Sequence, residues 1–293
     1  MKKAFYIFSI TLSVFIALMF TSCHDSIFET IENEIALDKS GIRGSMGSIV
    51  EYTDGNLYIT PMNKGVIYRK SATANTKGGW QKLSAPKTPV AIALDGGTLY
   101  MLAVDWAEGS GDYEGYNVPT YFEYTSTNGT SWSYTNRSFG YSENSSNLPS
   151  RYKNQCCSVT VGGVTYSIPS SLTTDTITIS SGGSKNADKG YIYAITATGS
   201  SVIIGTETGL YSLPIVSGGL GTPTPYVGDG STDTNSTLTN DVPIVYVPQK
   251  YRNDRTAEAS SVIYAYNCPR GSGGTTNEGL MAYFPGSGWN RDH

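Results

Sequence analysis

Aromatic and acidic side chains are concentrated in one stretch of the sequence, DWAEGSGDYEGYNVP, between Asp105 and Pro119. Its rings and carboxylates belong to Asp105, Trp106, Glu108, Asp112, Tyr113, Glu114 and Tyr116. Flat apolar rings can stack on the C–H faces of sugars, and carboxylates accept hydrogen bonds from sugar hydroxyls. The stretch is therefore a candidate carbohydrate-binding site. The alternative is that these rings only cover apolar residues beneath a long loop.

Several kinds of catalysis are excluded by residue type. The only histidines are His24 and His293, which leaves no candidate for a histidine-dependent mechanism or for a Cys/His zinc site. No glycine-rich phosphate loop of the Walker type occurs. We therefore expect no metal and no cofactor, and we assign no catalytic residue. A glycan hydrolase or lyase that uses carboxylates and tyrosines remains an alternative to a binding protein, since it needs only two carboxylates at a set separation. A structural subunit of an envelope complex is a third possibility.

The start of the chain has a charged, an apolar and a small-residue segment in order. Lys2 and Lys3 are followed by the apolar stretch Ala4–Phe20 and then by Thr-Ser-Cys, which ends at Cys23. This order resembles a bacterial lipoprotein signal peptide, in which the cysteine becomes the lipidated first residue. A membrane-spanning helix is the alternative, although the apolar run is slightly short for a bilayer.

The resemblance divides the chain into a signal peptide (1–22), a tether after the lipidated Cys23 (23–46) and a folded domain (47–293). It implies an extracytoplasmic protein that touches the membrane only through its lipid. His24 follows the cysteine in place of the aspartate that retains lipoproteins at the inner membrane, so the implied location is the outer membrane. The net charge of −4 becomes about −6 without the two lysines of the signal peptide. With no basic cluster, we expect no nucleic-acid partner, and a monomer that binds a glycan or an envelope protein.

Three cysteines remain after Cys23: Cys156, Cys157 and Cys268. Adjacent cysteines rarely pair with each other, so a disulfide would join Cys268 to one of the other two. The alternative is that all three are reduced and buried as small apolar residues.

The composition favours β-structure. Gly (33) and Tyr (22) are abundant and only 15% of residues are charged, a mixture that suits pleated strands and tight turns. From about residue 47 onward, short alternating strands are separated by Asp-Gly, Gly-Gly and Gly-Ser turns. Such spacing predicts an all-β sandwich, a barrel or a propeller.

Internal repetition favours the propeller. One unit reads SIVEYTDGNLYITPMNKGVIYRKS and then GGWQKLS, which predicts four short strands in succession, and three further units have a similar pattern. Trp80, Trp132 and Trp289 each open a predicted fourth strand, and the second gap of 157 residues is about three times the first gap of 52. We therefore predict five four-stranded antiparallel blades, the weakest at 155–183. Six blades or another all-β fold are the alternatives.

The segment STNGTSW carries a turn motif. It resembles the Asp-box turn of sialidase-like (BNR-type) propellers, with Ser126, Gly129 and Trp132 in place, Asn128 where the aspartate stands, and one residue fewer before the glycine. We expect Asn128 to bond its own backbone, the glycine to take a positive φ, and the tryptophan to pack between strands. In that family the box lies away from the ligand site, so the resemblance marks a fold. No Arg-Ile-Pro segment accompanies the eight arginines, and we do not expect sialidase activity.

Propeller geometry indicates which loops could bind a ligand. The connections between second and third strands, and those between blades, emerge on one face. Two of the former are long here, 105–119 and 267–278, and the second carries Arg270. The linkers 139–154 and 217–241 would join them. Because binding residues are often found on loops over a rigid scaffold, we predict a ligand site on this face.

Overall fold

The computed structural model describes most of the chain from residue 46 onward. The described residues are 46–61, 65–74, 78–108, 115, 117–139, 149–153, 156–169, 173–217, 219–226, 238, 241–252, 261–268, 279–285 and 288–291. The predicted signal peptide, the predicted lipidation site Cys23 and the predicted tether thus lie outside the described residues, except for Met46, where the first strand begins.

The described strands form five sheets, which we call blades 1 to 5 in chain order. Blade 1 contains β1 (Met46–Glu51), β2 (Asn56–Pro61), β3 (Val66–Ser71) and β4 (Gln81–Ser84). Blade 2 contains β5 (Thr88–Asp95), β6 (Thr98–Glu108), β7 (Asn117–Ser126) and β8 (Ser133–Phe139). Blade 3 contains β9 (Ser158–Val161), β10 (Val164–Ser167), β11 (Thr176–Ile179) and β12 (Ser184–Asn186).

The last two blades follow the same plan. Blade 4 contains β13 (Ile192–Ala197), β14 (Ser201–Thr206) and β15 (Gly209–Val216), with the short strands β16 (Gly219–Leu220) and β17 (Thr224–Pro225) both paired to β15. Blade 5 contains β18 (Asp241–Tyr246), β19 (Ile263–Cys268), β20 (Gly279–Phe284) and β21 (Gly288–Arg291). Two single-turn helices, α3 (Ser150–Lys153) and α4 (Gln249–Arg252), lie in the connections.

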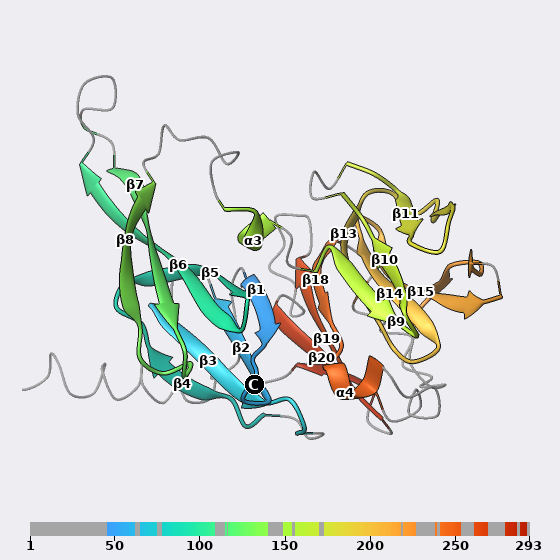
Figure 1. Ribbon diagram of the computed structural model, residues 1–293, viewed down its shortest axis with the longest axis horizontal. Coiled ribbons are helices and arrows are strands. Elements are labelled where there is room, and N and C mark those ends of the chain that lie inside the picture. Colours follow the sequence, from blue (N-terminus) through green and yellow to red (C-terminus); the bar gives the residue numbers. More distant parts are fainter. Residues whose placement is uncertain are drawn as a thin grey trace, which may run out of the picture. The chain divides into compact units, whose positions relative to one another are not determined.

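Every blade is antiparallel, and consecutive strands are neighbours except in blade 4, where β17 pairs with β15 and not with β16 (Figure 1). The prediction of an all-β propeller with five antiparallel blades is confirmed; four of them are four-stranded, and blade 4 has a fifth, short strand among the described residues. The tight turns are of the predicted kind: at the first of them the Asp54 carboxylate accepts the N–H of Asn56 at 2.9 Å, and Gly55 takes a φ of +75°. A short polar side chain followed by a glycine is suited to that geometry.

Adjacent blades pack closely where glycine replaces a side chain. A Cβ on Gly47 of β1 would lie 1.7 Å from the carbonyl oxygen of Val90 in β5, and one on Gly205 of β14 would lie 2.2 Å from that of Val242 in β18. These glycines therefore let the backbones of neighbouring blades approach. The hydroxyl of Ser48 adds a bond across the first junction by donating to the Ile92 carbonyl at 2.7 Å.

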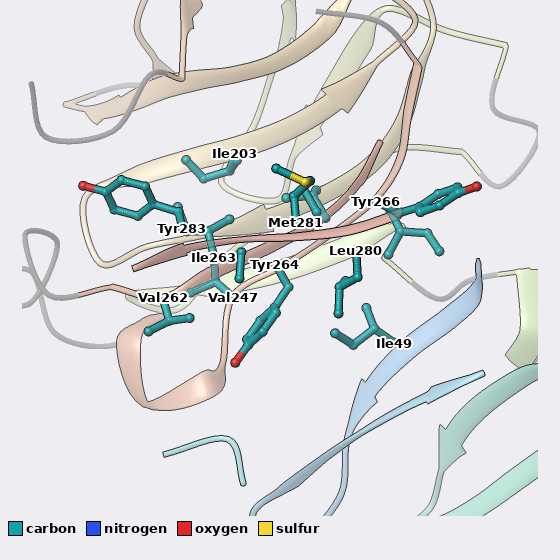
Figure 2. Close-up of a cluster of buried hydrophobic side chains, with 14 of the residues drawn as sticks. Ile49, Ile203, Val247, Val262, Ile263, Tyr264, Tyr266, Leu280, Met281 and Tyr283 are labelled. Atoms are coloured by element: carbon teal, nitrogen blue, oxygen red, sulfur yellow. The ribbon is translucent and has the colours of Figure 1, made fainter. Parts of the chain in front are cut away.

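Blade 5 buries both of its faces. Figure 2 shows Ile203 of β14 on the side of the sheet where Met281 and Tyr283 lie, and Ile49 of β1 on the side of Leu280. Alternate residues of a strand point to opposite faces, so consecutive apolar residues in β20 pack against blade 4 and blade 1 in turn. This explains why its sequence, GLMAYF, is apolar throughout.

A buried lysine joins blade 1 to blade 5. Lys70 of β3 is 2% exposed, and its ammonium lies 5.5, 5.4 and 5.1 Å from the ring centroids of Trp80, Tyr264 and Phe284. Aromatic faces attract cations, most strongly where water is excluded. The tryptophan that opens β4 is therefore part of an inter-blade contact.

The cysteine pair precedes blade 3. Cys156 is a free thiol, in agreement with the reduced alternative for this residue, and burial raises its pKa to about 12. Cys157 is 6% exposed in an apolar cluster shared by blades 3 and 4. The side chain of Cys268 lies outside the described part of the chain.

Candidate functional site

The stretch predicted as a loop between Asp105 and Pro119 is largely strand. β6 continues to Glu108 and β7 begins at Asn117, with Asp105 opposite Thr120 and Glu108 opposite Asn117 (Figure 1). The loop prediction was therefore wrong at both ends. The acidic residues look like loop residues in the sequence, but no glycine or proline interrupts β6 before Gly109, so backbone pairing continues.

Strand geometry separates residues that the sequence places side by side. Successive side chains of a strand point to opposite faces, so Asp105 and Trp106 cannot form one site, whereas Trp106 and Glu108 share a face. The Trp106 side chain is 55% exposed, the most exposed large apolar residue in the described part of the chain. A tryptophan left in water on a paired strand is available to a ligand.

Asp105 is already engaged on its own face. Its carboxylate forms an ion pair with Lys87, whose ammonium also lies 4.5 Å from the centroid of the Phe122 ring. The hydrogen bond to Lys87 lowers the pKa of the Asp105 carboxyl, and the same bond raises the pKa of Lys87. Since both side chains are solvated, the pair contributes little to stability.

Three aromatic rings lie on the same face as Asp105 and form what we call the aromatic platform. Tyr134 of β8, 43% exposed, lies 6.0 Å from Phe122 and 5.6 Å from Tyr124 between ring centroids. Sequence reasoning missed this group because it depends on the register of β8 against β7, where Tyr124 pairs with Tyr134. Blade 2 thus carries aromatic rings on both faces.

Strand β7 of blade 2 also carries a buried carboxylate. Glu123 of β7 is 1% exposed, and its Oε1 accepts bonds from Arg151 at 2.6 Å and from the Tyr152 hydroxyl at 3.2 Å. Its Oε2 lies 3.3 Å from Nη1 of Arg137, and the hydroxyl of Thr135 also donates to it. Both carboxylate oxygens are occupied by donors of the chain itself.

This network fastens α3 to blade 2. Arg151 also stacks on Tyr100, 4.0 Å from its ring centroid, and reaches Asp95 at 3.4 Å. Burial, with Glu123 as a second cause, holds the pKa of Tyr152 far above its usual range. A phenol that stays protonated is a poor nucleophile, and a carboxylate whose oxygens already accept hydrogen bonds is a poor base. The cluster is therefore a structural joint.

The turn after β7 has the hydrogen bonds that the sequence predicts for Asn128. Asn128 Oδ1 accepts the N–H groups of Thr130 at 3.0 Å and Ser131 at 2.8 Å, and Ser126 Oγ accepts that of Gly129 at 2.9 Å. The glycine has a φ of +69°. Trp132 packs against the apolar cluster between blades 1 and 2. Asparagine thus supplies the acceptor that aspartate would supply.

The remaining predicted site residues lie outside the described residues: Cys23, Asp112, Tyr113, Glu114, Tyr116 and Arg270. In the part of the chain that the structure describes, no group of three or more potential metal ligands is present. No helix among the described residues has the length and apolar character needed to cross a membrane.

Comparisons with known proteins add little to this geometry. No protein-family model and no curated protein matches the sequence. The solved structures that are similar at low identity include the following three. The PQQ-bound aldose sugar dehydrogenase from Streptomyces coelicolor is 10% identical with a TM-score of 0.40, covering 83% of this chain and 95% of that one. A functionally unknown protein from Desulfotomaculum acetoxidans is 9% identical with a TM-score of 0.27, covering 82% and 66%. The fission yeast SREBP–SCAP binding domains are 13% identical with a TM-score of 0.23, covering 78% and 74%. At these TM-scores the likenesses carry no argument about function.

Proposed function

We propose that this chain is an envelope-anchored binding protein that recognises a glycan through Trp106 and Glu108, at the end of β6 in blade 2. The observation that carries the proposal is Trp106, which is 55% exposed on a strand that pairs with β7 from Leu99 to Glu108. Folding tends to cover tryptophan, and a large ring left in water on a rigid element is typical of a contact surface.

The neighbouring groups suit a sugar. Glu108 lies two residues from Trp106 on the same face and is exposed, so a ring stacked on the indole could donate a hydroxyl hydrogen to this carboxylate. Because β6 and β7 are paired along this length, both side chains are presented by a preordered backbone, which lowers the entropy cost of binding.

Binding fits the described carboxylates of blade 2 better than hydrolysis does. Glu123 is saturated by donors of the chain and Asp105 is paired with Lys87. A glycoside hydrolase needs two carboxyl groups available to the substrate, one as an acid and one as a base or nucleophile. Asp95 is paired with Arg151, so Glu108 is the one carboxylate left among the described residues of blade 2, and a single carboxylate cannot fill both roles.

Truncation of the exposed tryptophan tests the proposal. Trp106→Ala is expected to weaken binding to a soluble glycan by about tenfold or more, because buried aromatic anchors dominate binding surfaces. The thermal midpoint should not change, since the ring is mostly in water. Affinity is measured by calorimetry on the ligand that a glycan array selects. Tyr191→Ala is the matched control, because Tyr191 is 50% exposed outside blade 2 and should leave the affinity unchanged. An array without hits, or equal losses in both variants, rejects the proposal.

Anchoring rests on the lipoprotein-like first 23 residues and is tested separately. If Cys23 carries the lipid, Cys23→Ser removes the acceptor and the protein should move from the membrane fraction to the soluble fraction of the envelope. Fractionation of cells, with mass spectrometry of the mature first residue, measures this. Membrane retention of the serine variant would contradict the proposed anchor while leaving glycan binding untouched.

A further inference from the structure

Polar residues from three blades meet at the inner strands. Glu51 is the last residue of β1 in blade 1, Tyr246 is the last residue of β18 in blade 5, and Cys156 lies two residues before β9 of blade 3. Arg252, at the end of α4, completes the group, which we call the axial cluster.

Direct contacts hold the cluster together. The Tyr246 hydroxyl donates to Glu51 Oε2 at 3.1 Å, and the backbone N–H of Gln249 donates to the same oxygen at 2.7 Å. The guanidinium carbon of Arg252 lies 4.7 Å from the centroid of the Tyr246 ring. The charge of Arg252 acts on the thiol of Cys156 and lowers its pKa, against the larger raising effect of burial.

The blades that supply these residues place the cluster near the propeller axis. In a ring of five blades, blades 1 and 5 are neighbours because they are the first and last in the chain, whereas blade 3 is adjacent to neither of them. The innermost strands of a propeller surround its central channel, where residues of non-adjacent blades can approach one another. The carbonyl of Cys156 bonds the N–H of Ile195 in β13 at 2.7 Å, and Thr196 Oγ1 accepts the N–H of Val247 at 3.1 Å. Blade 4 thereby links the blade 3 and blade 5 sides of the cluster.

Arg252 retains hydrogen-bonding capacity. Its Nε donates to the Val247 carbonyl at 2.6 Å. Within the described ranges, its two terminal nitrogens have neither a hydrogen bond nor an ion pair, and Glu51 is held by Tyr246 and Gln249 instead. A guanidinium fixed along one edge and stacked on a ring presents its other edge as two parallel N–H donors, the geometry that matches a carboxylate.

We propose that the axial cluster binds the carboxylate of a small hydroxy acid, with Arg252 as the bidentate donor stacked on Tyr246. Glu51 Oε1 accepts no hydrogen bond within the described part of the chain, so it can take a ligand hydroxyl. A ligand that carries both groups, such as a sugar acid, should therefore bind better than a carboxylate alone or a neutral sugar alone.

Calorimetry on the full chain at pH 7 tests this with glucuronate, acetate and glucose as probes. Glucuronate is expected to bind at least about tenfold more tightly than either of the others, because each lacks one charge-assisted contact. Arg252→Gln should reduce glucuronate affinity by about tenfold or more. Lys250→Gln is the matched control: this neighbouring cation on α4 is exposed and donates to the Thr73 carbonyl, and its loss should change the affinity by less than about twofold.

Further measurements distinguish this site from blade 2 and from a folding defect. Trp106→Ala should leave glucuronate binding unchanged, so failure of the blade 2 proposal would not affect this one. If Arg252→Gln unfolds the protein, Arg252→Lys is the second variant, because it keeps the positive charge but lacks the two parallel N–H donors. It should still lose most of the preference for glucuronate over acetate. Absence of glucuronate binding, equal binding of glucose, or unchanged affinity in the folded Arg252 variants overturns the proposal.

Discussion

Replacing Glu123 with alanine is expected to lower the free energy of unfolding by about 3–5 kcal/mol, the usual effect of removing one partner from a buried ion pair. The side chain of Arg151 is 19% exposed and would lose its 2.6 Å bond to the carboxylate, while the Tyr152 hydroxyl would lose its acceptor. Both residues belong to α3, so the helix should detach from blade 2 before the sheet itself unfolds.

Chemical denaturation followed by tryptophan fluorescence measures the loss, and hydrogen exchange at 150–153 reports the release of α3. Arg137→Ala is the matched control from the same network, because its side chain is 50% exposed and its bond to Glu123 is longer, 3.3 Å. That variant should lose less than about 1 kcal/mol, as expected of a solvated pair. Equal losses in the two variants would contradict the view that burial determines the strength of this joint.

The blades were predictable from the sequence because their signals are local. Turns such as Asp54-Gly55 and the tryptophans before fourth strands fall within a few residues of the strands that they delimit. Even blade 3 was recoverable, since its strands follow glycine turns at positions such as Gly162-Gly163. Short-range turn chemistry and strand alternation are sufficient for this level of description.

The arrangement of side chains was less predictable because it depends on distant partners. In the alternating run TYFEYTS, Glu123 resembles a solvent-facing residue, and only Arg151, 28 residues later, explains its burial. Asp105 and Trp106 were predicted to share one site because neighbouring residues of a loop can point the same way. They lie on β6, where neighbouring side chains point to opposite faces, and the sequence did not indicate where that strand ends. Glu51 and Tyr246 are 195 residues apart, and no local pattern connects them.

The second large effect is expected at Gly129, in the turn that resembles an Asp-box. Gly129→Ala should destabilise the protein by about 2–5 kcal/mol, combining about 1–2 kcal/mol for a side chain in the left-handed region with about 1–3 kcal/mol for overpacking. A Cβ at this position would lie 1.9 Å from the hydroxyl oxygen of Tyr58. That tyrosine cannot easily move, because it is fully buried and donates to Asp54 Oδ2 at 2.8 Å.

Gly55→Ala separates the two contributions. Gly55 has a similar φ of +75°, but no atom lies within 4 Å of its would-be Cβ, so only the backbone cost of about 1–2 kcal/mol should remain. Thermal and denaturant unfolding of both variants measure the difference, which isolates the contact between the blade 2 turn and β2 of blade 1. Equal destabilisation would mean that the turn needs its glycine for φ alone. A larger loss at Gly129 would show that the turn also fastens neighbouring blades through the contact between Gly129 and Tyr58.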